Sequence, residues 1–114
     1  MENCIFCKIA AGIIPSSKIF EDDRVFAFRD IHPQAPTHIL IIPKKHYADL
    51  YELDLSDQHL MGYLLHIAAE LARKETIEQK GYRIAINSGP EGGQVVQHIH
   101  LHLLGGRELA GELG

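Results

Sequence analysis

The sequence predicts an α+β fold, with a sheet of about five antiparallel strands, one long helix on one face and a short helix near the start. Residues 56–80 show a long helical pattern, and short apolar runs lie on both sides of it. Glycine, proline and aspartate separate these runs, as turns between strands require. The 114 residues match one domain, so we expect a single domain over residues 1–114.

The first half of the chain predicts a short helix, a hairpin and a further strand. Residues 4–11 (CIFCKIAA) read as a helix, which we expect to stop at Gly12. Residues 17–22 and 24–30 are short runs divided by an Asp-Asp pair, which indicates a hairpin. After a loop with two prolines, the β-branched run at 37–45 (THILIIPKK) predicts a strand.

The second half predicts the long helix followed by two strands. Ser56 is a good N-cap for a helix that continues to about Lys80, and Gly81 stands where a helix commonly stops. Residues 82–87 and 95–104 predict strands, with a glycine-rich loop between them. The helix carries a single apolar stripe, formed by Leu60, Leu64, Ile67 and Leu71.

Composition excludes several classes of protein. The net charge is −4 and no block of Lys or Arg forms a nucleic-acid footprint, so we expect no nucleic-acid partner. No apolar run approaches the length of about 20 residues that spans a membrane, and the N-terminus does not resemble a signal peptide. We therefore expect a cytoplasmic protein whose two cysteines are reduced.

Three histidines two residues apart are the strongest sign of chemistry. On a strand, His98, His100 and His102 would share one face, while the apolar residues between them would face the core. This pattern fits a solvated face, a metal site or nucleophilic catalysis by a neutral imidazole. The loop just before it contains Gly92 and Gly93, and such loops let backbone amides approach an anion closely, which favours phosphate chemistry.

The two cysteines form a C-x2-C pair near the start of the chain. Cys4 and Cys7 fit two buried thiols, a redox pair or half of a zinc site. Zinc requires two further ligands, for which histidine is the natural choice. The spacing alone does not decide among these alternatives.

The histidine run and its surroundings resemble a known family. The segment HIHLHLL (98–104) is similar to the signature of the histidine triad superfamily of nucleotide hydrolases and transferases. Residues 5–46 resemble the N-terminal half of these proteins. The segments GYRIAINSGPEGGQ (81–94) and HLLGGR (102–107) resemble their nucleoside-phosphoramidase branch in particular.

The resemblance implies a function and a site. It implies hydrolysis of purine nucleoside 5′-phosphoramidates to the nucleoside monophosphate through a nucleotidyl intermediate on His100. His102 would contact phosphate oxygens or the leaving group, His98 would fix the local arrangement, and His38 would complete the histidine cluster. The remaining substrate contacts would be Asp30 at the ribose hydroxyls, Asn87, Gly93, Gln94 and Val95 at the phosphate, and Phe6, Ile9, Ile14, Phe28 and Ile31 at the base.

The resemblance also bears on metal, partners and alternatives. Similarity to some bacterial members implies a structural zinc ion held by Cys4, Cys7, His46 and His98, with no organic cofactor, and a homodimer. Two other functions remain open: hydrolysis of dinucleoside polyphosphates on the same fold, and a non-catalytic module that binds zinc or a nucleotide. Val95 stands where the branch often has a small hydroxyl residue, and the tail RELAGELG lacks the usual aromatic ending. The preferred leaving group therefore stays open.

Overall fold

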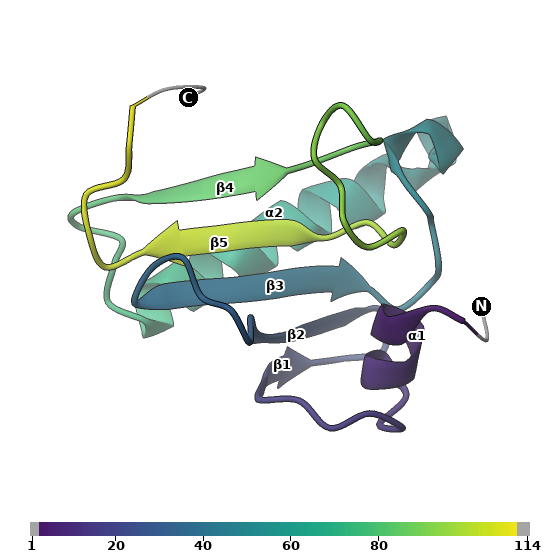
Figure 1. Cartoon of the computed structure of the whole chain (residues 1–114), viewed down its shortest axis with the longest axis horizontal. Helices are drawn as coiled ribbons and strands as arrows, with labels where there is room; N and C mark the ends of the chain where they lie inside the picture. Colours follow the sequence, from purple (N-terminus) through teal and green to yellow (C-terminus); the bar gives the residue numbers. More distant parts are fainter. Residues whose placement is uncertain (1–2, 112–114) are drawn as a thin grey trace.

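The computed structural model of the chain describes residues 3–111 and confirms the α+β class. All strand pairs are antiparallel, in the order β1-β2-β3-β5-β4 (Figure 1). The elements are α1 (Ile5–Ala10), β1 (Lys18–Glu21), β2 (Val25–Arg29), β3 (Thr37–Pro43), the 3-10 turns η1 (Leu50–Glu52) and η2 (Leu55–Asp57), α2 (Gln58–Lys74), β4 (Tyr82–Ile86) and β5 (Leu101–Gly105).

The main core lies between the sheet and α2, which crosses behind the strands in Figure 1. Alternate residues of each strand point toward the helix, as the pleat of a sheet requires. Within residues 3–111, no helix combines the length and the apolar character that crossing a membrane demands. The core residues are Val25, Ala27, Ile39, Ile41, Leu64, Ile67, Ala68, Leu71, Ala72, Ile77, Leu101 and Leu103.

The opposite face of the sheet carries a second, smaller apolar cluster, and the pocket that contains His38, His100 and His102 opens on it. Helix α1 lies on this face together with the loops that follow β2 and β4 (Figure 1). Phe6 and Ile9 of α1 pack there against residues of β2 and β3. Because α1 covers only part of the face, the rest remains available for a pocket. The cluster consists of Phe6, Ile9, Phe26, Phe28, Leu40 and Ile42.

Helix α2 is shorter at both ends than the sequence predicts. The carboxylate of Asp54, and not Ser56, caps the preceding 3-10 turn, where it accepts a hydrogen bond from the Ser56 amide at 2.8 Å. The helix ends at Lys74 because Thr76 adopts a left-handed conformation (φ 59°). The Ile77 amide then bonds back to the Ala72 carbonyl at 3.1 Å, which is the usual closure of a helix whose last position is left-handed.

The last strand begins later than predicted. Strand β5 starts at Leu101, so of the three histidines in the run only His102 lies on it. Both neighbouring strands stop pairing at this point, since Leu101 is the last partner of β3 and of β4. The Ile99 amide donates instead to the carbonyl of Tyr47, at 2.8 Å. His98 and His100 therefore sit in a non-strand segment that leads into the sheet.

Candidate active site and metal centre

A pocket of about 420 Å³ opens on the face of the sheet that carries α1. It gathers residues from α1, the end of β2, β3, the loop after β4 and the segment that enters β5. Most of the predicted site residues line it, but Ile14, Gln94 and His98 do not. Its lining comprises Ile5, Phe6, Ile9, Phe28, Asp30, Ile31, His32, Gln34, His38, Leu40, Asn87, Gly93, Val95, Val96, His100 and His102.

Sheet register brings two of the histidines together. His102 on β5 lies opposite Leu40 on β3, which makes His38 its diagonal neighbour. The two ring centroids are 5.2 Å apart, and His38 Nε2 lies 2.9 Å from His102 Nδ1. Asp30 Oδ2 stands 3.5 Å from the same His38 nitrogen. Two strands and the loop between β2 and β3 thus build one polar cluster.

Hydrogen-bond partners fix which nitrogen of His38 and of His102 carries the proton. The backbone amide of Gln34 donates to His38 Nδ1 at 3.0 Å, so this nitrogen must be unprotonated. A neutral His38 therefore carries its proton on Nε2 and donates it to His102 Nδ1. His102 in turn is protonated on Nε2, which makes no hydrogen bond within residues 3–111 and is left to a ligand in the pocket.

The ring of His100 is held in the opposite tautomer, with its proton on Nδ1. Its Nδ1 lies 2.7 Å from the carbonyl oxygen of His98, which only accepts, so Nδ1 carries the proton. The lone pair is therefore on Nε2, the nitrogen turned away from the backbone. Phe6 packs edge-on against the ring, with centroids 5.1 Å apart, and restrains its orientation. This is the arrangement that a nucleophilic imidazole requires.

Burial keeps all three pocket imidazoles neutral. It lowers the pKa of His38 and of His100 below the ordinary value. For His102, burial together with the adjacent rings of His100 and His38 lowers the pKa to about 4. Neutral rings at physiological pH provide one free lone pair, at His100, and one free N–H donor, at His102.

The glycine-rich loop is more tightly bonded to itself than the sequence suggests. The Gly93 amide donates to the Pro90 carbonyl and the Gln94 amide donates to the Gly89 carbonyl, both at 3.1 Å. Among the three predicted phosphate-binding amides, all within the described residues, only that of Val95 has no partner in the protein. Gln94 is buried and uses its side chain inside the fold, donating to the Ala48 carbonyl at 2.6 Å.

The predicted base-binding residues divide into two groups. Phe6, Ile9 and Phe28 are buried and form the apolar floor of the pocket. Ile31 is 84% exposed at the rim, as expected of a side chain that a ligand would cover. Ile14 packs against the smaller apolar cluster and does not line the pocket.

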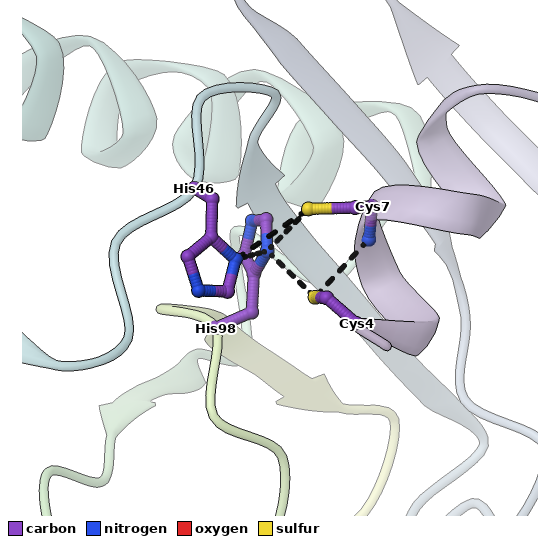
Figure 2. Close-up of side chains that lie close together, drawn as sticks. All are labelled: Cys4, Cys7, His46 and His98. Carbon is purple, nitrogen blue, oxygen red and sulfur yellow. Dashed lines mark hydrogen bonds between the residues drawn. The ribbon is translucent and has the colours of Figure 1, made fainter. Parts of the chain in front are cut away.

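A second cluster lies beside the pocket, where the start of α1 meets the segment before β5. Figure 2 shows Cys4 and Cys7 turned toward the rings of His46 and His98. His98 Nδ1 lies 3.2 Å from Cys4 Sγ, 3.6 Å from Cys7 Sγ and 3.2 Å from His46 Nδ1. His46 Nδ1 lies 3.4 Å from Cys7 Sγ.

These distances fit a tetrahedral zinc ion. With zinc–nitrogen and zinc–sulfur bonds of usual length, the tetrahedron has edges of about 3.3 Å between nitrogens and about 3.5 Å between nitrogen and sulfur. His98 Nε2 donates to the Pro43 carbonyl at 2.8 Å, which leaves Nδ1 unprotonated and aimed at the sulfurs. Burial and the adjacent Cys4 raise the pKa of Cys7 to about 11, so two thiolates would require a cation between them.

The two clusters separate the triad histidines. The cysteine cluster contains His98, and a second group with metal-binding potential contains Asp30, His38 and His102. His100 belongs to neither group. In the second group the hydrogen bonds described above already occupy both nitrogens of His38, whereas in the cysteine cluster two sulfurs and two ring nitrogens lie within 4.8 Å of one another.

Several pocket residues were not predicted from the sequence. Ile5, His32, Gln34, Leu40 and Val96 also line the pocket. Leu40 could have been found, because it is two residues from His38 on a strand and therefore shares its face. The others depend on how loops fold, which periodicity does not reveal.

The HIT domain family profile matches residues 11–109. The chain belongs to the HIT family. A "purine nucleoside phosphoramidase" of Escherichia coli K12 is 47% identical over 108 residues, which cover 95% of this chain and 91% of that protein. A "14 kDa zinc-binding protein" of Zea mays is 51% identical, over 92% of this chain and 83% of that protein.

Solved structures of HIT proteins show the same architecture. A HIT family hydrolase from Legionella pneumophila is 52% identical and superposes with a TM-score of 0.96, over 98% of this chain and 100% of that one. A histidine triad protein from Clostridium difficile is 44% identical, with a TM-score of 0.94 over 96% of each chain. The family expected from the histidine run is thus confirmed.

Proposed function

We propose that this HIT protein hydrolyses purine nucleoside 5′-phosphoramidates to the nucleoside monophosphate. The observation that carries the proposal is the state of His100, a buried neutral ring whose Nδ1–H is bonded to the His98 carbonyl and whose Nε2 is free. The similarity to the E. coli phosphoramidase supports the choice of substrate.

In the first step, the Nε2 lone pair of His100 attacks the α-phosphorus and forms a nitrogen–phosphorus bond. The bond from phosphorus to the amine breaks, its electron pair stays on the departing nitrogen, and that nitrogen takes a proton from a water molecule. In the second step, the hydroxide from that water attacks phosphorus and returns the electron pair to His100. One water is consumed, and the products are the amine and the nucleoside monophosphate.

The surrounding groups stabilise charge on the phosphate oxygens. Within the described residues, His102 Nε2–H and the Val95 amide have no hydrogen-bond partner in the protein, and Asn87 also lines the pocket. Donors fixed in place before reaction stabilise a transition state without reorganising. A neutral His102 suits this role, because its N–H stays available at physiological pH.

The apolar floor and Asp30 would position the nucleoside. Asp30 Oδ1 accepts a hydrogen bond from the His32 amide at 2.8 Å, which holds the carboxylate in place and leaves lone pairs on Oδ2 for the ribose hydroxyls. Phe6 and Phe28, with ring centroids 5.5 Å apart, would pack against the base. Such contacts recognise a flat ring more than its edge, which fits purines in general.

We further infer a structural zinc ion at Cys4, Cys7, His46 and His98. The ion would fix His98, whose carbonyl orients His100, and so support the nucleophile without contacting substrate. The Zea mays zinc-binding relative agrees with this assignment. The same relative also favours the non-catalytic alternative, in which the chain binds zinc or a nucleotide without turnover.

We also propose a homodimer that works in the cytoplasm. In the sheet, β4 pairs on one side only, with β5, so a second copy could extend the sheet side by side. The two free thiols suit a reducing compartment. Light scattering should give twice the chain mass of 12.8 kDa, and a mass of one chain would contradict the dimer.

A substrate panel tests the proposed reaction. The wild-type protein should release AMP from an AMP-amine conjugate with a higher kcat/KM than it shows for a diadenosine polyphosphate. Faster cleavage of the polyphosphate would favour the other hydrolase. Binding of AMP without turnover of either compound would favour the non-catalytic module.

A further inference from the structure

Gly106 and Arg107, directly after β5, contact the loop between β2 and β3. Gly106 has φ 92°, and a Cβ there would lie 2.9 Å from Pro36 Cβ. A larger residue is therefore disfavoured both by backbone conformation and by contact. Only a glycine lets the chain pass this close to the loop.

Arg107 makes the polar part of the same contact. Its Nε and Nη2 both donate to the carbonyl oxygen of Gln34, at 3.1 and 2.8 Å, and its Nη1 donates to the Glu108 carbonyl at 2.8 Å. A planar guanidinium that places two donors on one oxygen restrains position and direction together. Arg107 thus holds residue 34 by its carbonyl group.

Residue 34 also touches the catalytic cluster. The Gln34 amide donates to His38 Nδ1, and this bond forces the His38 proton onto Nε2. Gln34 itself is exposed, so water competes for this amide unless something else holds the residue. Within residues 30–36, the other contacts that restrain the loop lie well before residue 34: the Asp30 amide donates to the His38 carbonyl, the His32 amide donates to Asp30 Oδ1, and Asp30 Oδ2 lies 3.5 Å from His38 Nε2.

We propose that Arg107 is a positioning residue that holds Gln34 so that its amide fixes the proton-bearing nitrogen of His38. The consequence reaches the pocket through one further bond. If His38 carried its proton on Nδ1, its Nε2 would become an acceptor and His102 would have to donate from Nδ1. His102 would then turn a bare Nε2 toward the phosphate oxygens, replacing attraction by repulsion.

The test measures the histidine tautomers directly. Long-range ¹H–¹⁵N spectra of histidine-labelled protein distinguish Nδ1–H from Nε2–H rings. The wild type should show the Nε2–H form alone at His38 and His102. Arg107→Ala should show a mixture of both forms at His38, whereas Arg107→Lys, which retains one donor, should keep most of the wild-type form. Arg73→Ala, which removes an exposed arginine on α2, is the matched control and should change nothing.

Kinetics give a second readout, which rests on the proposed function. In Arg107→Ala the single-turnover rate of AMP release should fall about tenfold, a loss similar to that of one well-placed hydrogen bond. The Kd for adenosine, which lacks the phosphate that His102 would contact, should stay within about threefold of wild type, since the bonds that place Asp30 do not involve Arg107. A change in KM alone, with an unchanged rate, would point to a loop that merely shapes the pocket.

The outcomes separate this inference from the proposed reaction. If the wild-type protein does not hydrolyse the AMP-amine conjugate, the proposed reaction is wrong. The spectra would still test the role of Arg107. Wild-type tautomers in Arg107→Ala would overturn the inference whatever the activity. If Arg107→Ala does not fold, Arg107→Met keeps the apolar stem without donors. Failure of both to fold would overturn the inference too, because the residue would then be a structural support.

Discussion

The cysteine cluster and the histidine pocket lie side by side, and each contains a pair of histidine rings in close contact. The two pairs differ in the other groups that their nitrogens contact. In the cluster, His46 and His98 approach with their Nδ1 atoms 3.2 Å apart, and both nitrogens face sulfur. In the pocket, His38 and His102 approach to 2.9 Å, but one nitrogen donates to the other. Two sulfurs and two ring nitrogens that converge offer four ligands to a cation, whereas the rings of His38 and His102 form a hydrogen-bond chain. The second partner of each ring, therefore, decides its chemistry.

His98 connects the two regions. Its side chain belongs to the cluster, while its carbonyl accepts the Nδ1–H of His100 in the pocket. The cluster is thus placed to orient His100, the proposed nucleophile, without entering the proposed reaction. Changes made in each region should consequently have different effects on turnover, stability and metal content.

Replacing the proposed nucleophile should abolish turnover while leaving the proposed zinc site intact. In His100→Ala, kcat for an AMP-amine conjugate should fall by at least about 10³-fold, as expected when the attacking group is lost. AMP should still bind and the zinc content should equal that of wild type. His66→Ala, at an exposed histidine of α2, is the control. Turnover at the parental rate in His100→Ala would end the assignment of this residue.

Removing a ligand of the cysteine cluster should lower the thermal stability of the protein, because the proposed zinc ion would stabilise the fold without contacting the substrate. Wild-type protein should contain one zinc per chain, and Cys7→Ser should contain none. A tightly bound ligand stabilises a small domain by about 3–4 kcal/mol, so the variant's Tm should fall by at least about 10 °C. Chelation should bring wild type down to the variant's Tm. Equal Tm values before chelation would argue against a structural ion.

Neutralising the carboxylate in the pocket should weaken binding of ribonucleotides. Asp30→Asn should raise KM about tenfold, the effect of one or two hydrogen bonds to a charged group. It should also reduce the preference for ribose over 2′-deoxyribose substrates, which a competition assay measures. Asp23→Asn, at the exposed turn between β1 and β2, serves as the control. An unchanged sugar preference would remove Asp30 from the ribose site.

The ion pair between Arg29 and Glu75 should affect the stability of the protein and leave turnover unchanged. Glu75 accepts two hydrogen bonds from Arg29, at 2.9 and 3.0 Å, and these lower its pKa below the ordinary 4.5. Because Arg29 is well exposed, solvent screening reduces the pair's value, and Glu75→Gln should cost only about 1 kcal/mol.

The pH dependence of this pair has a defined sign. A depressed folded-state pKa gives stability that is complete above pH 4.5 and disappears as the pH falls through the folded-state value. The Tm difference between wild type and Glu75→Gln should therefore close in acid. Glu70→Gln, in the exposed pair with Arg73, should show almost no difference at any pH. A difference that grows in acid would contradict the role of the pair.

Patterns along the chain predicted most of the fold, because periodicity reports which face of an element is buried. The start of α2, the end of α2 and the start of β5 differ from the prediction, and they depend on signals that a pattern does not carry. Thr76 ends α2 in a conformation that usually indicates glycine, so the helix was expected to reach the glycine at position 81. The last strand was expected from residue 95, but both of its neighbours stop pairing at Leu101.

The site was predicted only as far as a resemblance allowed. Cys4 and His98 are 94 positions apart in the sequence, and no local rule joins them. The same holds for the bond between Arg107 and Gln34, 73 positions apart. The tautomers of the pocket histidines could not be predicted from the sequence either, because they depend on the groups that contact each ring nitrogen in the fold.

Trapping the covalent intermediate tests whether His100 is the nucleophile. Rapid quenching of wild-type protein with an AMP-amine conjugate, followed by mass spectrometry of the peptide containing residues 98–102, should show an AMP adduct on His100. The adduct should form and decay at rates compatible with turnover. Turnover without any adduct, or an adduct on His98 or His102, would contradict the account.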